Sequence, residues 1–211
     1  MKKINIKILV ITSIVCLLPI ICGLIFYNEL PEKVAIHWGI DNNPNGYFQK
    51  PAFVFGMPIM MVILQIFCCI VSDVSDKNPE DNKKAVTVYK WIIPILTVIL
   101  YIVTIMVALG NNLDIRKIVM IILGIMFIIV GNYMPKARND YYINSKIFWV
   151  KNKDEKLVKR AVKISAYSII FFGFLFILSI LFKPVVSVVA LIASIVLSFY
   201  IYIYVYIKSR K

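Results

Sequence analysis

The sequence has few of the residues that build catalytic and metal sites. It contains one histidine, His37, and four cysteines, and none of them falls in a spacing typical of metal ligands. A single histidine cannot supply a Ser-His-Asp or Cys-His set in the cytosol if it lies in an extracellular loop, as argued below. The sequence therefore predicts no enzyme, and it gives no reason to expect a metal ion or another cofactor.

Charged residues are also scarce, since they make up 17% of the chain while hydrophobic residues make up 61%. Soluble globular domains are about 45–50% apolar, so a soluble domain is excluded. Six apolar runs have the length of about 20 residues that crosses a bilayer core, and none carries a charge in its interior. Because lipid cannot satisfy open backbone groups, we predict an all-α integral membrane protein with six transmembrane helices. The runs are 8–27, 52–72, 91–109, 115–134, 164–182 and 185–207.

The basic residues are distributed unevenly over the segments that connect these runs. With six spans, 19 of the 24 Lys and Arg residues fall on the side that holds both termini. Cytoplasmic segments are enriched in Lys and Arg, so we expect both termini in the cytoplasm and the loop 28–51 outside the cell. Topology and contact with anionic lipid account for the net charge of +13. The lipid bilayer is thus the expected partner, and direct binding of nucleic acid is not predicted.

All four cysteines lie inside the apolar runs, where a disulfide framework is not expected. We expect free thiols that act as small hydrophobic side chains. The first run is about 20 residues long and exceeds the roughly 7–15 residues of a signal-peptide core, so we expect it to remain as a span. The cysteines are Cys16, Cys22, Cys68 and Cys69.

The first outer loop, LPEKVAIHWGIDNNPNGYFQKP, is a dense polar and aromatic segment between two apolar runs. The stretch VAIHW has strand character, and NPNG, residues 43–46, is a turn signal. A mere connector could be much shorter, so we predict a recognition surface here. The alternative for the lone histidine is a hydrogen bond within the loop. The predicted ligand-binding residues are His37, Trp38, Asn45, Gly46, Tyr47 and Lys50.

The inner loop 135–163 ends in a basic amphipathic pattern that leads into the fifth span. At 100° per residue, four basic side chains of DEKLVKRAVKIS share one sector and apolar side chains fill the opposite one. Two interpretations stay open: an elbow on the membrane surface, or a docking surface for a cytosolic partner. The predicted partner-binding residues are Lys146, Trp149, Lys156, Lys159, Arg160 and Lys163.

Other local signals concern helix ends and helix packing. Asn78 and Pro79 suit the start of a helix that runs to Leu109, and Pro94 should kink that helix. Small residues repeat on single helix faces, which is typical of close helix packing in membranes. The tyrosine-rich tail alternates like a strand, but we favour a helix that ends in an aromatic belt. The small residues are Gly124 and Gly131 in the fourth span, and Ala190, Ser194 and Ser198 in the sixth.

Two motifs resemble those of the SdpI family of bacterial membrane proteins. The outer loop is similar to the uncharacterised N-terminal domain of this family, and GNYMPKARND is similar to the stretch that ends its fourth span. In the outer loop the matching residues are Leu30, Pro31, His37, Trp38, Gly46, Tyr47, Lys50 and Pro51. In the inner stretch they are Gly131, Asn132, Met134, Pro135, Lys136 and Asn139.

The resemblance implies an immunity protein that protects its producer against an extracellular peptide toxin. It also implies a second role, in which a cytosolic repressor-like protein is held at the membrane once toxin is bound. It divides the chain into an N-terminal domain, 1–72, with two spans, and an SdpI-like domain, 73–211, with four. The alternative is a permease-like or transporter-accessory protein, because the polar residues within the spans are uncharged and an uncharged substrate could still pass.

Overall fold

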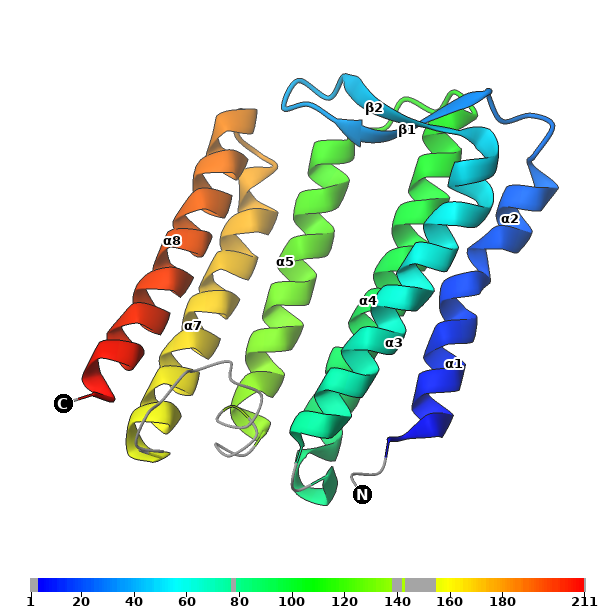
Figure 1. Ribbon diagram of the computed structural model, residues 1–211. Helices are drawn as coiled ribbons and strands as arrows, with labels where there is room; N and C mark the ends of the chain where they lie inside the picture. Colours follow the sequence, from blue (N-terminus) through cyan, green and yellow to red (C-terminus); the bar gives the residue numbers. More distant parts are fainter. Residues whose placement is uncertain (1–3, 77–78, 138–141, 143–154, 211) are drawn as a thin grey trace. The chain divides into compact units, whose positions relative to one another are not determined.

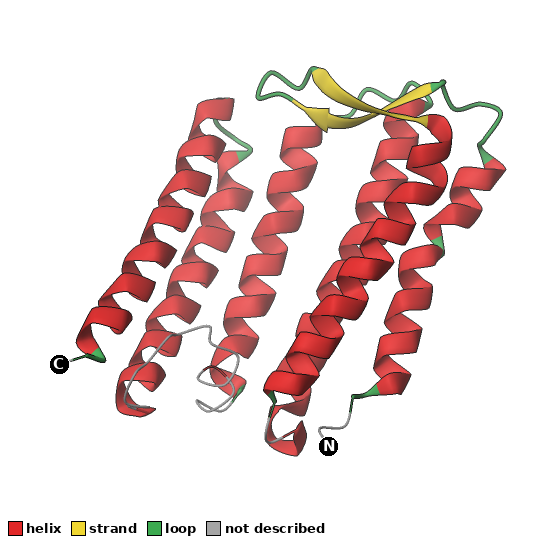
Figure 2. Cartoon of the chain, viewed as in Figure 1, coloured by secondary structure: helices red, strands yellow, loops and turns green. Residues whose placement is uncertain are grey.

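The computed structural model describes residues 4–76, 79–137, 142 and 155–210. Helices dominate it, and a short β-hairpin joins the first two spans (Figures 1 and 2). The elements before the hairpin are α1 (Ile6–Leu17) and α2 (Pro19–Ile25), and the hairpin consists of β1 (Lys33–Trp38) and β2 (Pro44–Gln49). The elements after it are the π-helix η1 (Ala52–Gly56), α3 (Met57–Ser75), α4 (Pro79–Ala108), α5 (Ile115–Tyr133), the 3-10 helix η2 (Met134–Lys136), α7 (Glu155–Ser179) and α8 (Pro184–Lys208).

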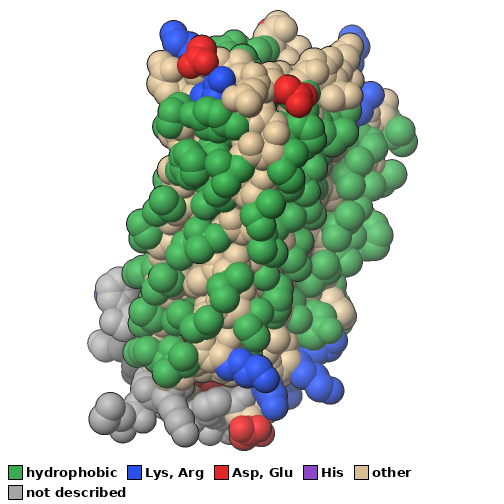
Figure 3. All heavy atoms as spheres, turned by 90° about the vertical axis from the view of Figure 1, so that its right-hand side faces the viewer, with side chains coloured by type: hydrophobic (Ala, Val, Ile, Leu, Met, Phe, Trp, Pro, Cys, Tyr) green, Lys and Arg blue, Asp and Glu red, His purple; other side chains and the backbone are tan. Residues whose placement is uncertain are grey.

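The described residues form six helical segments that are long and apolar enough to cross a membrane, which confirms the predicted spans. The chain is therefore a multi-pass membrane protein. On the face drawn in Figure 3, hydrophobic side chains cover the flanks of the helices, and charged side chains gather at the helix ends. The segments are Ile6–Ile25, Ala52–Ser75, Glu80–Ala108, Ile115–Lys136, Glu155–Ser179 and Pro184–Lys208.

The first span departs from the prediction because it is divided at a proline. The helix α1 ends at Leu17, and α2 begins at Pro19. Proline has no backbone N–H, and its ring clashes with the carbonyl group four residues earlier. The predicted single helix over 8–27 is thus two shorter helices that end at Ile25.

Three other helix predictions agree with the structure. The third helix runs from Pro79 to Ala108, one residue short of the predicted end, and it contains Pro94. The basic amphipathic segment and the fifth span form one continuous helix, α7. The tyrosine-rich tail is helical as far as Lys208. The kink at Pro94 stays a prediction.

The chain folds as two compact units, and their boundaries fall inside α3, α4 and α5. Unit 2 contains Ile4–Ile70 and Lys90–Arg116, and unit 1 contains the described residues of Val71–Tyr89 and Lys117–Lys211. The hairpin belongs to unit 2, whereas α7 and α8 belong to unit 1. The predicted division into domains at residue 72 stays a prediction.

The core of unit 2 packs around two stacked aromatic rings. Phe53 of η1 and Tyr101 of α4 have ring centroids 4.6 Å apart, and their planes differ by 11°. The Tyr101 hydroxyl donates a hydrogen bond to the Val54 carbonyl oxygen at 3.3 Å. A Cβ atom at Gly23 would collide with the Tyr101 hydroxyl oxygen, so glycine lets α2 approach this ring closely.

In unit 1, α5 and α7 approach each other through glycine. A Cβ atom at Gly124 would lie 2.7 Å from the Gly173 carbonyl oxygen, and one at Gly173 would lie 2.7 Å from the Gly124 oxygen. About two helical turns further along α5, a Cβ atom at Gly131 would lie 2.8 Å from the Ala166 carbonyl oxygen. The prediction that Gly124 and Gly131 serve helix packing is therefore confirmed.

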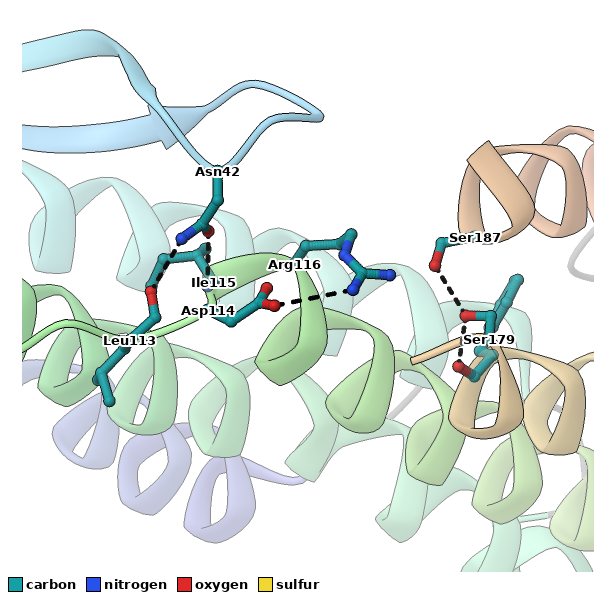
Figure 4. A network of polar contacts seen from close by, with 8 residues as sticks. Asn42, Leu113, Asp114, Ile115, Arg116, Ser179 and Ser187 are labelled. Atoms are coloured by element: carbon teal, nitrogen blue, oxygen red, sulfur yellow. Dashed lines mark hydrogen bonds and ion pairs between the residues drawn. The ribbon is translucent and has the colours of Figure 1, made fainter. Parts of the chain in front are cut away.

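The packing face of α8 differs in part from the predicted one. Ser194 is buried as expected, but Ser198 is exposed and donates its hydroxyl hydrogen to the Ser194 carbonyl oxygen at 2.8 Å. A hydroxyl that bonds to its own helix needs no partner helix, so a serine alone does not mark a contact face. Ser187 is buried instead, and its hydroxyl lies 2.9 Å from that of Ser179 on α7 (Figure 4).

The glycine contact predicts the effect of a single methyl group. We expect Gly124→Ala to lower the free energy of unfolding by about 1–3 kcal/mol, because the backbone of α7 must move to admit the Cβ atom. Thermal unfolding of the purified protein in detergent measures the change. Gly56→Ala is the matched control, because no atom lies within 4 Å of its Cβ position. Equal effects of the two substitutions would contradict the close approach.

Candidate functional site

The outer loop forms an antiparallel hairpin whose turn lies earlier than the sequence predicted. The register pairs Lys33 with Gln49 at the open end and Trp38 with Pro44 next to the turn. The turn therefore spans 39–43, and NPNG falls largely inside β2, so the prediction of a turn at 43–46 is wrong. Proline is tolerated as the first residue of a strand, which is the position of Pro44.

Local hydrogen bonds fix this turn. The Gly39 amide donates to the Asn43 carbonyl oxygen at 2.8 Å, and the Asn43 amide donates to an Asp41 carboxylate oxygen at 3.2 Å. The side-chain amide of Asn43 also donates to Asp41, and this bond is the main reason why the pKa of Asp41 lies below its ordinary value. Its contribution to the turn is present above the ordinary pKa of aspartate and is lost as the pH falls through the lowered pKa.

One face of the hairpin is part of the core of unit 2. Val34 has no exposed surface, and Ile36 and Phe48 pack against the same cluster, which includes the aromatic pair Phe53 and Tyr101. Val34 and Ile36, two positions apart on β1, therefore both contact the core, as the alternation of a strand requires. Burial of apolar side chains holds the hairpin against the helix ends of this unit.

The predicted ligand-binding residue Lys50 is buried at the base of the hairpin. Its ammonium group lies 3.0 Å from a Glu32 carboxylate oxygen and 5.2 Å from the centre of the Tyr27 ring. Its backbone amide donates to the Glu32 carbonyl oxygen at 2.9 Å. With 8% of its surface exposed, Lys50 closes the hairpin base and is barely accessible to a ligand.

The structure brings three of the other predicted residues together on the strands. The ring nitrogen Nδ1 of His37 is hydrogen-bonded to the Asn45 side-chain oxygen, and His37 lies opposite Gly46 in the register. A Cβ atom at Gly46 would lie 2.9 Å from the His37 Cβ, so glycine makes room for the imidazole. His37 thus forms a hydrogen bond within the loop, which was the alternative considered from the sequence, and its side chain remains exposed.

Exposed apolar groups accompany this histidine. Tyr47 exposes 51% of its surface, and its hydroxyl donates to the Pro44 carbonyl oxygen at 3.3 Å. Ile40 in the turn is also 51% exposed, whereas Trp38 is half-buried. Ile40 was not among the predicted site residues. Its position between Gly39 and Asp41 in a polar turn could have indicated an exposed apolar contact residue.

The tip of the hairpin is joined to the start of α5 by Asn42, which the sequence analysis missed (Figure 4). Its side-chain amide donates to the Leu113 carbonyl oxygen at 3.1 Å, and its side-chain oxygen accepts from the Ile115 amide at 2.8 Å. Asn42 has φ of 64°, a conformation that asparagine tolerates better than most residues. The Asn42 bridge therefore caps α5 from a distant segment of the chain.

The predicted inner residues divide into three groups. The predicted residues on α7 are all exposed. Of the family-motif residues, Gly131 packs against α7, while Asn132 at the end of α5 and Pro135 in η2 are exposed. Lys146, Trp149 and Asn139 lie outside the described residues. The exposed basic residues on α7 are Lys156, Lys159, Arg160 and Lys163.

The described ranges contain no disulfide and no cluster of metal ligands. None of the four cysteines forms a disulfide, and Cys16 and Cys69 are fully buried. Within residues 4–76, 79–137, 142 and 155–210, no group of three or more His, Cys, Asp or Glu side chains could hold a metal ion.

Comparisons with known proteins cover both the hairpin and the whole chain. Residues 14–62, which include the hairpin, match a family described as a domain of unknown function, DUF1648. The chain is 28% identical over 201 residues to the Immunity protein SdpI of Bacillus subtilis (strain 168), a match that covers 92% of this chain and 95% of the relative. No solved structure matches. The family resemblance that the two motifs indicated is thereby confirmed.

The Asn42 bridge predicts a graded response to substitution. Asn42→Gly keeps the backbone conformation but loses both side-chain hydrogen bonds, so we expect a loss of about 1–3 kcal/mol in unfolding free energy. Asn42→Ala should lose about 1 kcal/mol more, because alanine is strained at positive φ. Hydrogen exchange of the Ile115 amide should accelerate in both variants. The same substitutions at the exposed Asn28 serve as controls, and unchanged exchange at Ile115 in Asn42→Ala would contradict the bridge.

Proposed function

We propose that this chain, a member of the SdpI family, is a membrane immunity protein that protects its producer against an extracellular peptide toxin. The relative named Immunity protein SdpI matches it over nearly the whole length of both chains. The observation that carries the proposal is the hairpin, an ordered polar and aromatic surface between two spans. A short connector is enough to reverse the chain direction between two spans, so the hairpin is larger than a connection requires.

The proposal places the hairpin outside the cell and both termini in the cytoplasm. Six spans return the chain to the side on which it starts, and 19 of the 24 Lys and Arg residues then lie on that side. Such an excess is typical of cytoplasmic segments. The hairpin is thus presented to molecules that arrive from outside.

The toxin-binding surface is the solvent-exposed face of the hairpin. His37, Asn45 and Tyr47 are exposed there, and half-buried Trp38 and Gly46 complete the predicted set. Aromatic side chains with one polar edge are common anchors of protein interfaces. Because the opposite face is packed into the core of unit 2, the surface needs little ordering on binding, which favours affinity. Lys50 acts through the hairpin base and not by contact with the toxin.

The second part of the proposal is a relay to a cytosolic repressor-like protein through the inner loop 135–163. Support for it comes from the family resemblance and from the predicted cytoplasmic position of this loop. Lys146 and Trp149 are the predicted contacts that precede α7 in this loop. Recovery of no cytosolic protein with the purified wild type, before or after toxin exposure, would contradict the relay but leave the immunity proposal intact.

Survival of a sensitive strain tests the immunity function. An indicator strain without its own immunity protein should survive medium conditioned by Bacillus subtilis strain 168 when it expresses the wild-type chain. We expect the double variant His37→Ala, Trp38→Ala to lose at least about tenfold in survival, since truncation of an interface anchor commonly costs 2 kcal/mol or more.

The matched control is Lys33→Ala, Gln49→Ala, a cross-strand pair at the base of the same hairpin whose side chains are both exposed. Its survival should equal that of the wild type, and the membrane level of all three proteins is compared by immunoblot. Equal survival of the His37, Trp38 variant and the wild type would refute recognition by this surface. A wild type that gives no protection would refute immunity against this producer.

A further inference from the structure

We propose that the first turns of α7 bind the headgroup phosphates of anionic phospholipids. The basic residues of this helix start form a surface that the immunity function does not require, so the proposal holds whichever toxin the hairpin recognises. The surface, called the α7 basic face below, consists of Lys156, Lys159, Arg160 and Lys163.

Packing fixes the direction in which the α7 basic face points. The intervening apolar residues of the same turns are almost fully buried in a core cluster of unit 1, while all four basic side chains are exposed. The helix therefore cannot rotate to hide the charges without exposing this cluster. Glu155 is the one acidic residue in the α7 sequence, so little negative charge offsets the face. The buried residues are Leu157, Val158, Ala161 and Val162, with 7%, 0%, 3% and 3% of their surface exposed.

The outward surface of α7 changes from basic to apolar within one turn. Lys163 is followed by Ile164 and Tyr167, which are 52% and 62% exposed, and its ammonium group lies 5.9 Å from the centre of the Tyr167 ring. Beyond them, Phe171 and Phe174 are 60% and 55% exposed, as suits contact with acyl chains. The four residues from Lys163 to Tyr167 correspond to a rise of about 6 Å. A headgroup layer is roughly 5–8 Å thick, so Lys163 lies at the level of the phosphates.

The helix α8 gives an independent marker of depth in the same unit. Val205 packs in the same core cluster as Val158, so the neighbouring Tyr204 and Tyr206 lie near the level of the first turns of α7. Lys208 lies 5.4 Å from the centre of the Tyr204 ring, and Arg210 lies 4.4 Å from that of Tyr206. Tyrosines are enriched at the boundary between membrane and water. The α7 basic face is therefore at interfacial depth, and its long side chains can reach the phosphates.

This depth favours lipid over a soluble acidic protein as the occupant. A soluble protein would have to displace headgroups from around Lys163, whereas phospholipids already surround helices at this level. Arg160 can hold a phosphate with two parallel hydrogen bonds, and each lysine adds a point charge. The relay to a cytosolic partner would then depend on other residues of the inner loop.

The test counts lipids bound to the full chain. Purified protein in detergent is mixed with equal amounts of dioleoyl phosphatidylglycerol and dioleoyl phosphatidylcholine, and native mass spectrometry measures which lipid is retained. We expect the wild type to prefer phosphatidylglycerol. Replacement of all four residues of the α7 basic face by glutamine should reduce the preference for phosphatidylglycerol at least about fivefold. That is the effect expected from the loss of a single basic contact, which contributes about 1 kcal/mol.

The matched control removes the same number of charges from exposed positions of the same unit. It carries glutamine at Lys83, Lys84, Lys117 and Lys183, none of which lies beside the tyrosines that mark this depth, and it should keep most of the preference. Circular dichroism and gel filtration show whether both variants fold. The proposal is overturned if the α7 variant keeps the wild-type preference, or if the control loses as much. It is equally overturned if the α7 variant keeps its lipids but releases a bound acidic protein.

Salt provides a second measurement that needs no variant. Raising the NaCl concentration from about 50 mM to about 500 mM should weaken the preference of the wild type, because exposed charges are screened. A preference that does not change with salt would mean that the phosphates are not held by this face.

Discussion

The fold depends on one constraint, which is that every backbone polar group within lipid needs a partner inside the protein. Helices meet this need over most of each span. Side-chain hydroxyl groups within the spans meet it by bonding to their own helix, as Thr97 does by donating to the Ile93 carbonyl oxygen at 2.8 Å. Where the helix is interrupted, another element compensates. At the π-helix η1, the Tyr101 hydroxyl donates to the Val54 carbonyl oxygen. Buried Gln65 likewise donates to the Lys90 carbonyl oxygen at 2.8 Å and so links α3 to α4 within unit 2.

Outside the lipid the same constraint is relaxed, and there the chain can form a hairpin with open edges. Its shape is set by contacts with the helix ends of unit 2 and not by the strands alone. Val34 enters the core, the Lys50 and Glu32 pair closes the base, and the Asn42 bridge holds the tip to the start of α5. A ligand that moves the tip would therefore act directly on the first turn of a transmembrane helix, which gives the proposed recognition surface a physical connection to the membrane part of the chain.

The sequence predicted what depends on local pattern and missed what depends on distant contacts. The spans, the start of α4 at Pro79 and the exposed basic residues of α7 follow from apolar length, capping residues and helical periodicity. The turn was misplaced because Asn42 takes a left-handed conformation that is stabilised by residues more than 70 positions away. The resemblance marked Lys50 as a motif position, but the sequence alone did not show that its side chain is buried and paired with Glu32 at the hairpin base. Ser198 was misjudged because Ser194 and Ser198 both bond to their own helix, and only the packing around α8 shows that Ser194 is buried and Ser198 is exposed.

The central claim is that the hairpin faces the outside of the cell while the start of α7 faces the cytoplasm, and thiol labelling in intact cells tests it most directly. The four native cysteines are replaced by alanine, and single cysteines are placed at Tyr47 or Lys156, both of which are exposed. A membrane-impermeant thiol reagent should label the cysteine at position 47 in intact cells and the one at position 156 only after permeabilisation. Labelling at position 156 but not at position 47 in intact cells would contradict the claim and remove the basis for toxin recognition by the hairpin.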